Sequence, residues 1–190
     1  AGKGFIQVID DGKGMSPRDS RMAFERHATS KISCAQDLFN IRTMGFRGEA
    51  LASIESVAEV ELRTKREEDE LGTYLFVADS ELKNQENINC SRGTNMLVKN
   101  LFYTIPARRK FLKSDSTELR QIIAEFCHVA LCRPEIGVRL VHNKKDIYNL
   151  KRANTLKQRI LEIEGRDMAR ELIDVSTSTS IVGITGFVGN

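Results

Sequence analysis

The sequence predicts an α/β (α+β) protein, because strand-like and helix-like runs both occur along its 190 residues. Residues 58–65 and 73–78 alternate apolar and polar side chains, which is typical of strands with one buried face. Residues 115–132 repeat apolar side chains every three or four positions, the spacing of one helical face. A composition of 41% hydrophobic and 29% charged residues is that of a folded globular chain.

The first half of the chain predicts four further features. Residues 5–9 are interpreted as a buried strand. Ser16 and Pro17 form an N-cap followed by proline at the first helical position, so we expect a helix from there to about Arg26. The polar stretch 27–50 is a long loop of the kind that usually carries function, and it leads into a short helix at 48–57.

The second half continues the same mixture of elements. A strand is expected at 94–101, after which Pro134 and Gly137 end the helix at 115–132. The remaining elements are a hairpin at 137–150, a helix at 154–163 and two strands in 171–190. A change of composition near Asn154 places a domain boundary at about residue 152. Both ends of the chain are abrupt, which indicates a piece of a larger protein.

Composition and charge restrict the class of protein only loosely. A net charge of +3 tolerates an anionic partner without requiring one. The four cysteines form no C-x-x-C pair and the three histidines do not cluster with them, so we expect free thiols in a reducing compartment rather than a structural zinc site. The chain has no apolar run long enough to span a bilayer and no leader at its start, which favours a cytosolic protein.

The first motif, "VIDDGKGMS", has the form D-x-G-x-G at Asp10, Gly12 and Gly14. A carboxylate at the end of a strand can accept a hydrogen bond from an exocyclic amine, and glycines beyond it let a ring lie against bare backbone. The alternative is a strand that runs into a glycine turn with exposed acids. A calcium loop fits poorly, because Lys13 stands where an acid is needed.

The second motif is "GFRGEAL", at residues 45–51. Free backbone N–H groups at a helix start bind anions, and glycine lets phosphate oxygens approach them. The alternative is a flexible loop capped by a helix. No Walker-type loop occurs in the chain, so a nucleotide would have to bind in another fold.

Two further stretches carry polar or basic side chains. In "RHATSKI", Thr29, Ser30 and Lys31 suit phosphate or lid contacts, and nucleophilic catalysis through His27 lacks a second acid. The stretch "GTNMLVKNLFYTIPARRKFLK" begins at Gly93 and ends in a basic cluster. As a charge run alone, that cluster is more often a solvated helix face.

These motifs occur in one order, and that order resembles the N-terminal ATPase region of the MutL family of DNA mismatch-repair proteins, within the GHKL ATPases. The resemblance implies a Bergerat-type sandwich, a mixed sheet with helices on one face, over residues 1–151. It also implies that the N-terminal helix and first strands of this domain are missing. Residues 152–190 resemble the truncated start of a ribosomal protein S5-like β-α-β domain.

The resemblance implies a nucleotide-binding role for each matching position. Asp10 resembles the residue that binds adenine N6, Gly12 and Gly14 lie beside the base, and Thr94 reaches adenine through water. The lid and phosphate cradle match the remaining positions, Thr29, Ser30, Lys31, Gly45, Phe46, Arg47, Gly48, Glu49, Ala50 and Leu51.

Other family features have no counterpart in this chain. The general-base Glu and the magnesium-binding Asn of the family lie on a helix before the first motif, and the γ-phosphate lysine is expected beyond residue 190. We therefore expect ATP and Mg²⁺ to serve the parent protein, and this piece, without a catalytic residue or metal ligand, to be incompetent in hydrolysis. The family's Asn-Thr before "PARRKF" is Thr104-Ile105 here.

The implied function is DNA mismatch repair, with ATP ordering the lid and closing two subunits together. The implied partners are DNA, mismatch-recognition and other repair proteins and a second copy of the parent, with no membrane. The location is cytoplasmic, or nucleoid-associated if bacterial. The alternatives are a nucleic-acid-binding module without a nucleotide site and another GHKL ATPase. Candidate DNA contacts, which could equally be solvated charges, are Arg108, Arg109, Lys110, Lys151, Arg152, Lys157 and Arg159.

Overall fold

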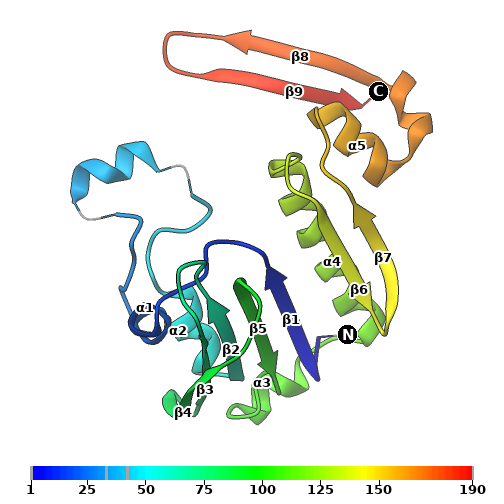
Figure 1. Cartoon of the computed structure of the whole chain (residues 1–190). Coiled ribbons are helices and arrows are strands. Elements are labelled where there is room, and N and C mark those ends of the chain that lie inside the picture. Colours follow the sequence, from blue (N-terminus) through cyan, green and yellow to red (C-terminus); the bar gives the residue numbers. More distant parts are fainter. Residues whose placement is uncertain (1, 33, 42, 190) are drawn as a thin grey trace. The chain divides into compact units, whose positions relative to one another are not determined.

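The computed structural model of the chain describes residues 2–32, 34–41 and 43–189 and divides into two compact units. The first unit, Gly2–Lys113, contains a five-stranded sheet with the strand order β1-β5-β2-β3-β4 (Figure 1). Its strands are β1 (Phe5–Asp10), β2 (Glu59–Lys65), β3 (Gly72–Ala78), β4 (Glu81–Ile88) and β5 (Gly93–Lys99).

One face of this sheet is built from three rows of side chains that run across β1, β5, β2 and β3. Residues directly opposite each other in antiparallel strands point to the same face, so the strand register defines each row. The first two rows are apolar and the third is polar. The rows are Ile6, Val98, Val60 and Val77, then Val8, Met96, Leu62 and Leu75, then Asp10, Thr94, Thr64 and Thr73.

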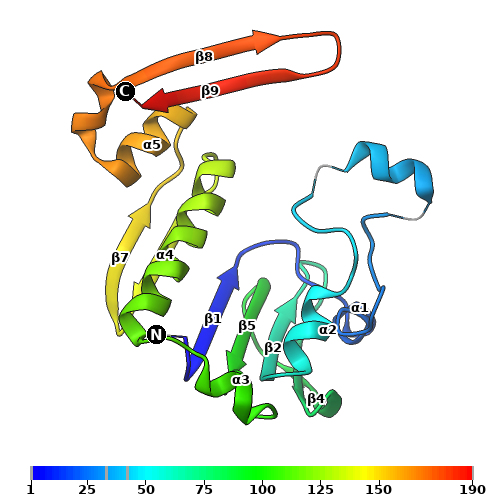
Figure 2. The ribbon, with the colours of Figure 1, turned by 180° about the vertical axis from the view of Figure 1, so that it is seen from behind.

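Two short helices cover the apolar rows over β2 and β3. These are α1 (Pro17–Met22) and α2 (Ala50–Glu55), and they lie on the same face of the sheet (Figures 1 and 2). Phe24, just after α1, packs into the core with the buried residues of β2 and β3, and Leu51 and Ile54 of α2 pack against it. The core therefore sits beside the polar row, which it holds at one end of the sheet.

The opposite face of the sheet carries a polar network. Glu61 pairs with Lys99 and, at 2.9 Å, with Arg63, whose guanidinium lies 5.0 Å from the ring centroid of Tyr74. The Lys99 ammonium is the main cause of the lowered pKa of the Glu61 carboxyl. This face also carries apolar side chains, such as Leu97 and Phe76, but the described core lies on the face that α1 and α2 cover.

Two expectations for the first half of the chain were wrong. The strand at residues 5–9 exists as β1 but is exposed, with Val8 at 62% and Ile9 at 68%, because β1 is an edge strand and the helices lie over β2 and β3. The helix after Pro17 ends at Met22 rather than near Arg26. Beyond it, the amides of Phe24 and Glu25 bond carbonyls three residues back, so the chain tightens into turns.

The sheet also differs from expectation in its composition and strand direction. Its strand pairs are antiparallel throughout the described residues, so the predicted α/β class is confirmed but the sheet is not mixed. No strand was predicted at β4, which pairs with β3 alone and is mostly exposed. An edge strand with this much solvent contact can be polar on both faces, and this removes the alternation that reveals a strand.

The second unit, from Ser114 onward, is built on the long helix α4 (Asp115–Cys132), whose bounds agree with the prediction. Ser114 caps this helix through a hydrogen bond from the Thr117 amide. Phe126 of α4 stacks on Tyr148 of the following hairpin, with 5.6 Å between ring centroids. The other elements are β6 (Val138–His142), β7 (Lys145–Leu150), α5 (Leu156–Glu164), η2 (Arg166–Arg170), β8 (Leu172–Ser178) and β9 (Gly183–Gly189).

Arg159 of α5 is a structural residue, and its proposed DNA contact was wrong. Its side chain is fully buried, and its Nη2 donates at 2.8 Å to each of the carbonyls of Pro134, Ile136 and Lys151. Glu162 pairs with Nη1 at 3.2 Å. The guanidinium therefore ties the loop after α4 to the segment before α5 and cannot reach a phosphate.

The predicted domain boundary at residue 152 lies inside the second compact unit and stays a prediction. The end of the chain forms an antiparallel hairpin of β8 and β9, as expected for two strands. Among the described residues, every helix is too short or too polar to cross a membrane.

We predict that Arg159→Met destabilises the second unit by about 3 kcal/mol or more, because three backbone carbonyls lose the donor that the buried guanidinium supplies. Urea or thermal unfolding measures the loss. Arg152→Met makes the same substitution at an exposed arginine nearby and should change stability by no more than about 0.5 kcal/mol. Equal effects of the two variants would contradict the structural role of Arg159.

We also predict a pH dependence that arises from Glu61. Because its pKa in the folded state lies below the ordinary value of 4.5, the ionised carboxylate stabilises the fold above that value. This stabilisation is lost as the pH falls from about 4.5 through the lowered pKa. The difference in unfolding free energy between wild type and Glu61→Gln should therefore shrink on acidification. The same difference measured in a Lys99→Met background should depend less on pH.

Candidate functional site

The predicted base-binding residues lie together at the polar end of the sheet. Asp10 ends β1 and is directly opposite Thr94, the second residue of β5. Thr94 is in turn opposite Thr64 of β2, and Thr64 is opposite Thr73 of β3. Thr64 is fully buried and Thr73 is 2% exposed, whereas Asp10 is exposed. The row thus runs from a buried interior to an exposed carboxylate.

The turn after Asp10 folds back on this row. Oδ1 of Asp10 accepts the Gly12 amide at 2.9 Å, and in the described part of the chain the other carboxylate oxygen makes no hydrogen bond. Gly14 has φ +68°, and a Cβ there would overlap the Lys65 carbonyl. Glycine is therefore required at position 14, where the turn touches the end of β2.

Two residues outside the predicted set hold the turn in place. The Thr64 hydroxyl accepts the Met15 amide at 3.0 Å, and Nε of Arg92 donates to the Gly12 carbonyl at 3.1 Å. Arg92 also pairs with Glu67 at 2.6 Å. The sequence contained one signal for Thr64. In the alternation of β2, this polar residue occupies a position on the buried face, where Val60 and Leu62 precede it.

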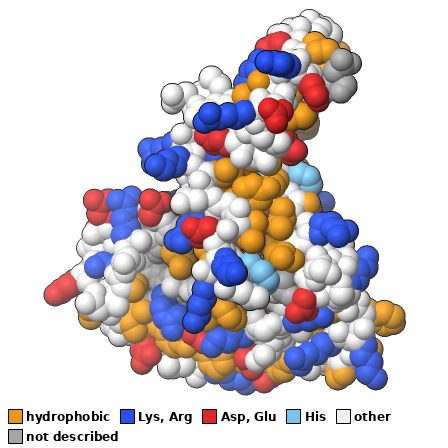
Figure 3. Space-filling view, turned by 90° about the vertical axis from the view of Figure 1, so that its right-hand side faces the viewer, with side chains coloured by type: hydrophobic (Ala, Val, Ile, Leu, Met, Phe, Trp, Pro, Cys, Tyr) orange, Lys and Arg blue, Asp and Glu red, His pale blue; other side chains and the backbone are white. Residues whose placement is uncertain are grey.

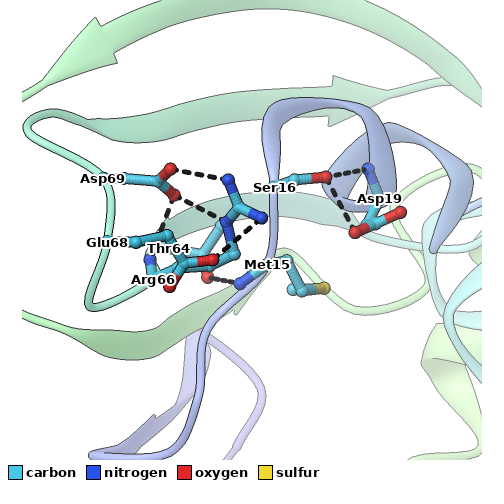
Figure 4. A network of polar contacts seen from close by, with 7 residues as sticks. All are labelled: Met15, Ser16, Asp19, Thr64, Arg66, Glu68 and Asp69. Atoms are coloured by element: carbon cyan, nitrogen blue, oxygen red, sulfur yellow. Dashed lines mark hydrogen bonds and ion pairs between the residues drawn. The ribbon is translucent and has the colours of Figure 1, made fainter.

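A second set of polar contacts lies where β2 leaves the row (Figure 4). Arg66 binds Asp69 through Nε and Nη2 at 2.9 and 2.7 Å, and Nη1 binds Glu68 at 3.0 Å. This pairing raises the pKa of Arg66 and lowers the pKa of Asp69. On the other side of Met15, Ser16 caps α1 by accepting the Asp19 amide at 3.0 Å. The Ser16 cap therefore fixes the end of the turn that leads into α1.

The lid motifs meet each other at Gly48. The His27 amide donates to the Gly48 carbonyl at 3.1 Å, and Nδ1 of His27 lies 3.2 Å from Oε1 of Glu49. Gly48 has φ +66°, and a Cβ there would overlap the carbonyl of Ala28. The segments 26–32 and 45–51, far apart in the loop, are thus joined by backbone contact.

A cavity of about 480 Å³ is lined by residues of the segment between His27 and Glu49. It has an anion-binding group in Arg47 and a hydroxyl in Thr29, together with apolar side chains. Asp10 and Thr94 do not line this cavity. The predicted adenine contacts and the predicted phosphate contacts therefore lie in two different places in the structure. The cavity is lined by His27, Thr29, Ile32, Cys34, Leu38, Arg47 and Glu49.

The other predicted lid residues have mixed environments. Thr29 accepts the Lys31 amide at 3.2 Å, and the Arg47 guanidinium lies 5.8 Å from the ring centroid of Phe46. Leu51 packs against the core, so its side chain is structural. Their proposed phosphate contacts, like those of Ser30, Gly45 and Ala50, stay predictions.

The predicted DNA contacts belong to both compact units. The last turn of α3 (Pro106–Lys110) contains Arg108, Arg109 and Lys110. Positive charge at this end of a helix interacts favourably with the helix dipole. On the face drawn in Figure 3, Lys and Arg side chains are interspersed with Asp and Glu. The Lys157 ammonium lies 5.8 Å from the ring centroid of Phe187. Apart from Arg159, the predicted DNA contacts remain open.

The departure from the family motif before α3 has a local consequence. Ile105 is the N-cap residue of α3 and makes no side-chain cap. The Thr104 hydroxyl instead donates to the Ser56 carbonyl at 3.3 Å. Isoleucine at position 105 therefore leaves this short helix without the hydroxyl that usually accepts an N-terminal amide.

A sheet covered by helices on one face is the layer arrangement expected above for a GHKL ATPase domain. Among solved structures, the chain is similar to the Aquifex aeolicus MutL ATPase domain complexed with ADP, at a TM-score of 0.73 and 26% identity over 92% of this chain and 61% of that one. A second structure of the Aquifex aeolicus MutL ATPase domain has a TM-score of 0.68 at 21% identity, over 98% of this chain and 62% of that one, and supports the fold alone.

The relatives identify the family. The chain is 56% identical to the DNA mismatch repair protein MutL of Parabacteroides distasonis over 189 residues and 54% identical to that of Bacteroides fragilis over 188 residues. It therefore belongs to the MutL family. These alignments cover 100% and 99% of the chain but only 31% and 30% of the relatives' lengths. No family model matches the sequence.

We predict that Gly48→Ala loosens the lid, because the new Cβ would meet the Ala28 backbone at a residue with positive φ. Hydrogen exchange at the His27 amide, which bonds the Gly48 carbonyl, should accelerate by about tenfold or more, as expected for a strain of 1–2 kcal/mol. Gly45→Ala is the matched control, since a Cβ there has nothing within 4 Å. Unchanged exchange in Gly48→Ala would contradict this prediction, because it would show that the new Cβ is accommodated without opening the contact.

Proposed function

We propose that this chain is the nucleotide-binding part of a MutL-type DNA mismatch-repair factor and that it binds ATP. The observation that carries the proposal is the Asp10–Thr94 pair at the polar end of the sheet, beside the glycine turn. An exposed carboxylate oxygen there can accept the exocyclic amine of adenine. The ADP complex of the Aquifex aeolicus MutL ATPase domain supports the choice of an adenine nucleotide.

The lid group would then serve the phosphates. Arg47 and Lys31 supply positive charge, and Thr29 supplies a hydroxyl on the segment that contacts Gly48. Nucleotide binding would order this long loop, and in the whole protein such ordering would favour the closure of two subunits. The separation of the lid cavity from Asp10 is consistent with a loop that has to move when the ligand binds.

The described residues contain no group of three or more His, Cys, Asp or Glu side chains that could hold a metal ion. They do not by themselves fit the Mg²⁺ site expected for the family, so in this proposal the phosphate charge is met by Arg47, Lys31 and backbone amides. Magnesium in the whole protein remains part of the family expectation.

Contacts with DNA and with mismatch-recognition and other repair proteins are proposed for the whole protein, as is a cytoplasmic or nucleoid location. Arg108, Arg109, Lys110, Lys151, Arg152 and Lys157 remain the candidate DNA contacts. A nucleic-acid-binding module without a nucleotide site is the weaker alternative. It gives no reason for a glycine turn built around an exposed Asp10 at the end of a polar row.

We predict that Asp10→Asn abolishes binding of an ATP analogue, because the amide presents an N–H or a neutral oxygen where an anionic acceptor is needed. Calorimetric titration of the intact protein measures the affinity, which should fall by about a hundredfold or more. Asp11→Asn, one residue further on, removes the same charge outside the row and should leave binding within about twofold of wild type. Wild-type affinity in Asp10→Asn would refute the proposed adenine contact.

A further inference from the structure

The Thr64 hydroxyl stands at the junction of three segments of the proposed base site. It lies 3.0 Å from the Met15 nitrogen, 3.0 Å from the Gly93 carbonyl oxygen and 3.4 Å from the Thr94 hydroxyl. The side chain is fully buried, and a buried hydroxyl is tolerated only where hydrogen bonds satisfy it. Valine or leucine would otherwise suit this position, as at Val60 and Leu62 of the same strand.

The direction of each hydrogen bond follows from the number of protons available. The Met15 amide can only donate, so Thr64 accepts it with one lone pair. The Gly93 carbonyl can only accept, so the single Thr64 proton is directed to it. In the contact with Thr94, Thr64 has only a second lone pair left, and Thr94 must be the donor. The Thr64 hydroxyl is then fully used, with one donated and two accepted bonds.

This assignment fixes the polarity of Thr94. Its proton is directed into the protein toward Thr64, so only the lone pairs of its oxygen remain for a ligand. Asp10, directly opposite on β1, also presents an acceptor. The site therefore shows acceptors at two neighbouring positions, and a carbonyl oxygen placed there would face oxygen on both sides.

We propose that Thr64 is a positioning residue that holds the Thr94 hydroxyl as an acceptor and thereby makes the site select a 6-amino purine over a 6-oxo purine. The inference rests on the proposed nucleotide function of this site. A water that bridges Thr94 to the ring has to donate one proton to Thr94. Its other proton suits the unprotonated N1 of adenine and not the N1–H of hypoxanthine.

Thr73 offers the contrast that separates positioning from packing. It is also a buried threonine, in the same row and directly opposite Thr64. In the part of the chain that the structure describes, its hydroxyl makes no hydrogen bond to Met15, Gly93 or Thr94. Removal of either hydroxyl disturbs the core, but only removal at Thr64 frees the Thr94 proton.

The test compares the affinities of the intact protein for ADP and IDP, which differ at position 6 and N1 of the base. Titration calorimetry gives the ratio of the two dissociation constants. In wild type the ratio should favour ADP, and in Thr64→Val it should fall by about tenfold, because Thr94 can then rotate and donate to the 6-oxo ring. Thr64→Ser, which keeps the hydroxyl, should restore the wild-type ratio.

The control variant is Thr73→Val, and different results would contradict the role of Thr64 and the proposed nucleotide function. Thr73→Val should retain the wild-type ratio even if its melting temperature falls. A folded Thr64→Val with the wild-type ratio would overturn the inference, and Thr64→Ala, which also lacks the hydroxyl, serves the same comparison if the valine variant does not fold. If wild type binds neither nucleotide, or if Asp10→Asn binds ADP as wild type does, the proposed function itself fails and not the role of Thr64.

Discussion

The register of β5 between β1 and β2 is the constraint on which the rest of the first unit depends. It aligns two apolar rows that α1 and α2 can cover, and it places the polar row at the end of the sheet next to the glycine turn. A shift of one residue in β5 would turn Thr94, Met96 and Val98 to the other face, where Glu61 and Lys99 form their ion pair. The core and the candidate site are therefore set by the same pairing.

The sequence predicted the elements whose periodicity is strong and failed where solvent or edge position weakens it. The alternation of β2 and β3 and the three-four spacing of α4 identified these elements closely. At β1 the apolar run was interpreted as buried, because a sequence does not show that a strand lies at an edge. At β4 the polar composition concealed a strand that only its partner β3 defines.

The sequence predicted those residues of the candidate site that belong to its motifs. Asp10, Gly14 and Gly48 could be found because a backbone with positive φ or a carboxylate at a strand end leaves a local pattern. Thr64 could not be assigned a role, because its partners Met15 and Gly93 are distant in the chain and meet only through the sheet. Arg159 was misjudged for the same reason. The three carbonyls that bind its guanidinium come from residues distant in the sequence, so the sequence does not show that this side chain is buried.

The polar row has a consequence for the order of events in folding. Its four residues come from positions 10, 64, 73 and 94, and only Thr64 and Thr73 can meet within one local hairpin, that of β2 and β3. A sheet that lacks β1 or β5 therefore has an incomplete row, without Asp10 or Thr94. A nucleotide bound at the proposed site would stabilise only the correctly aligned sheet, because a sheet with another alignment does not contain that site.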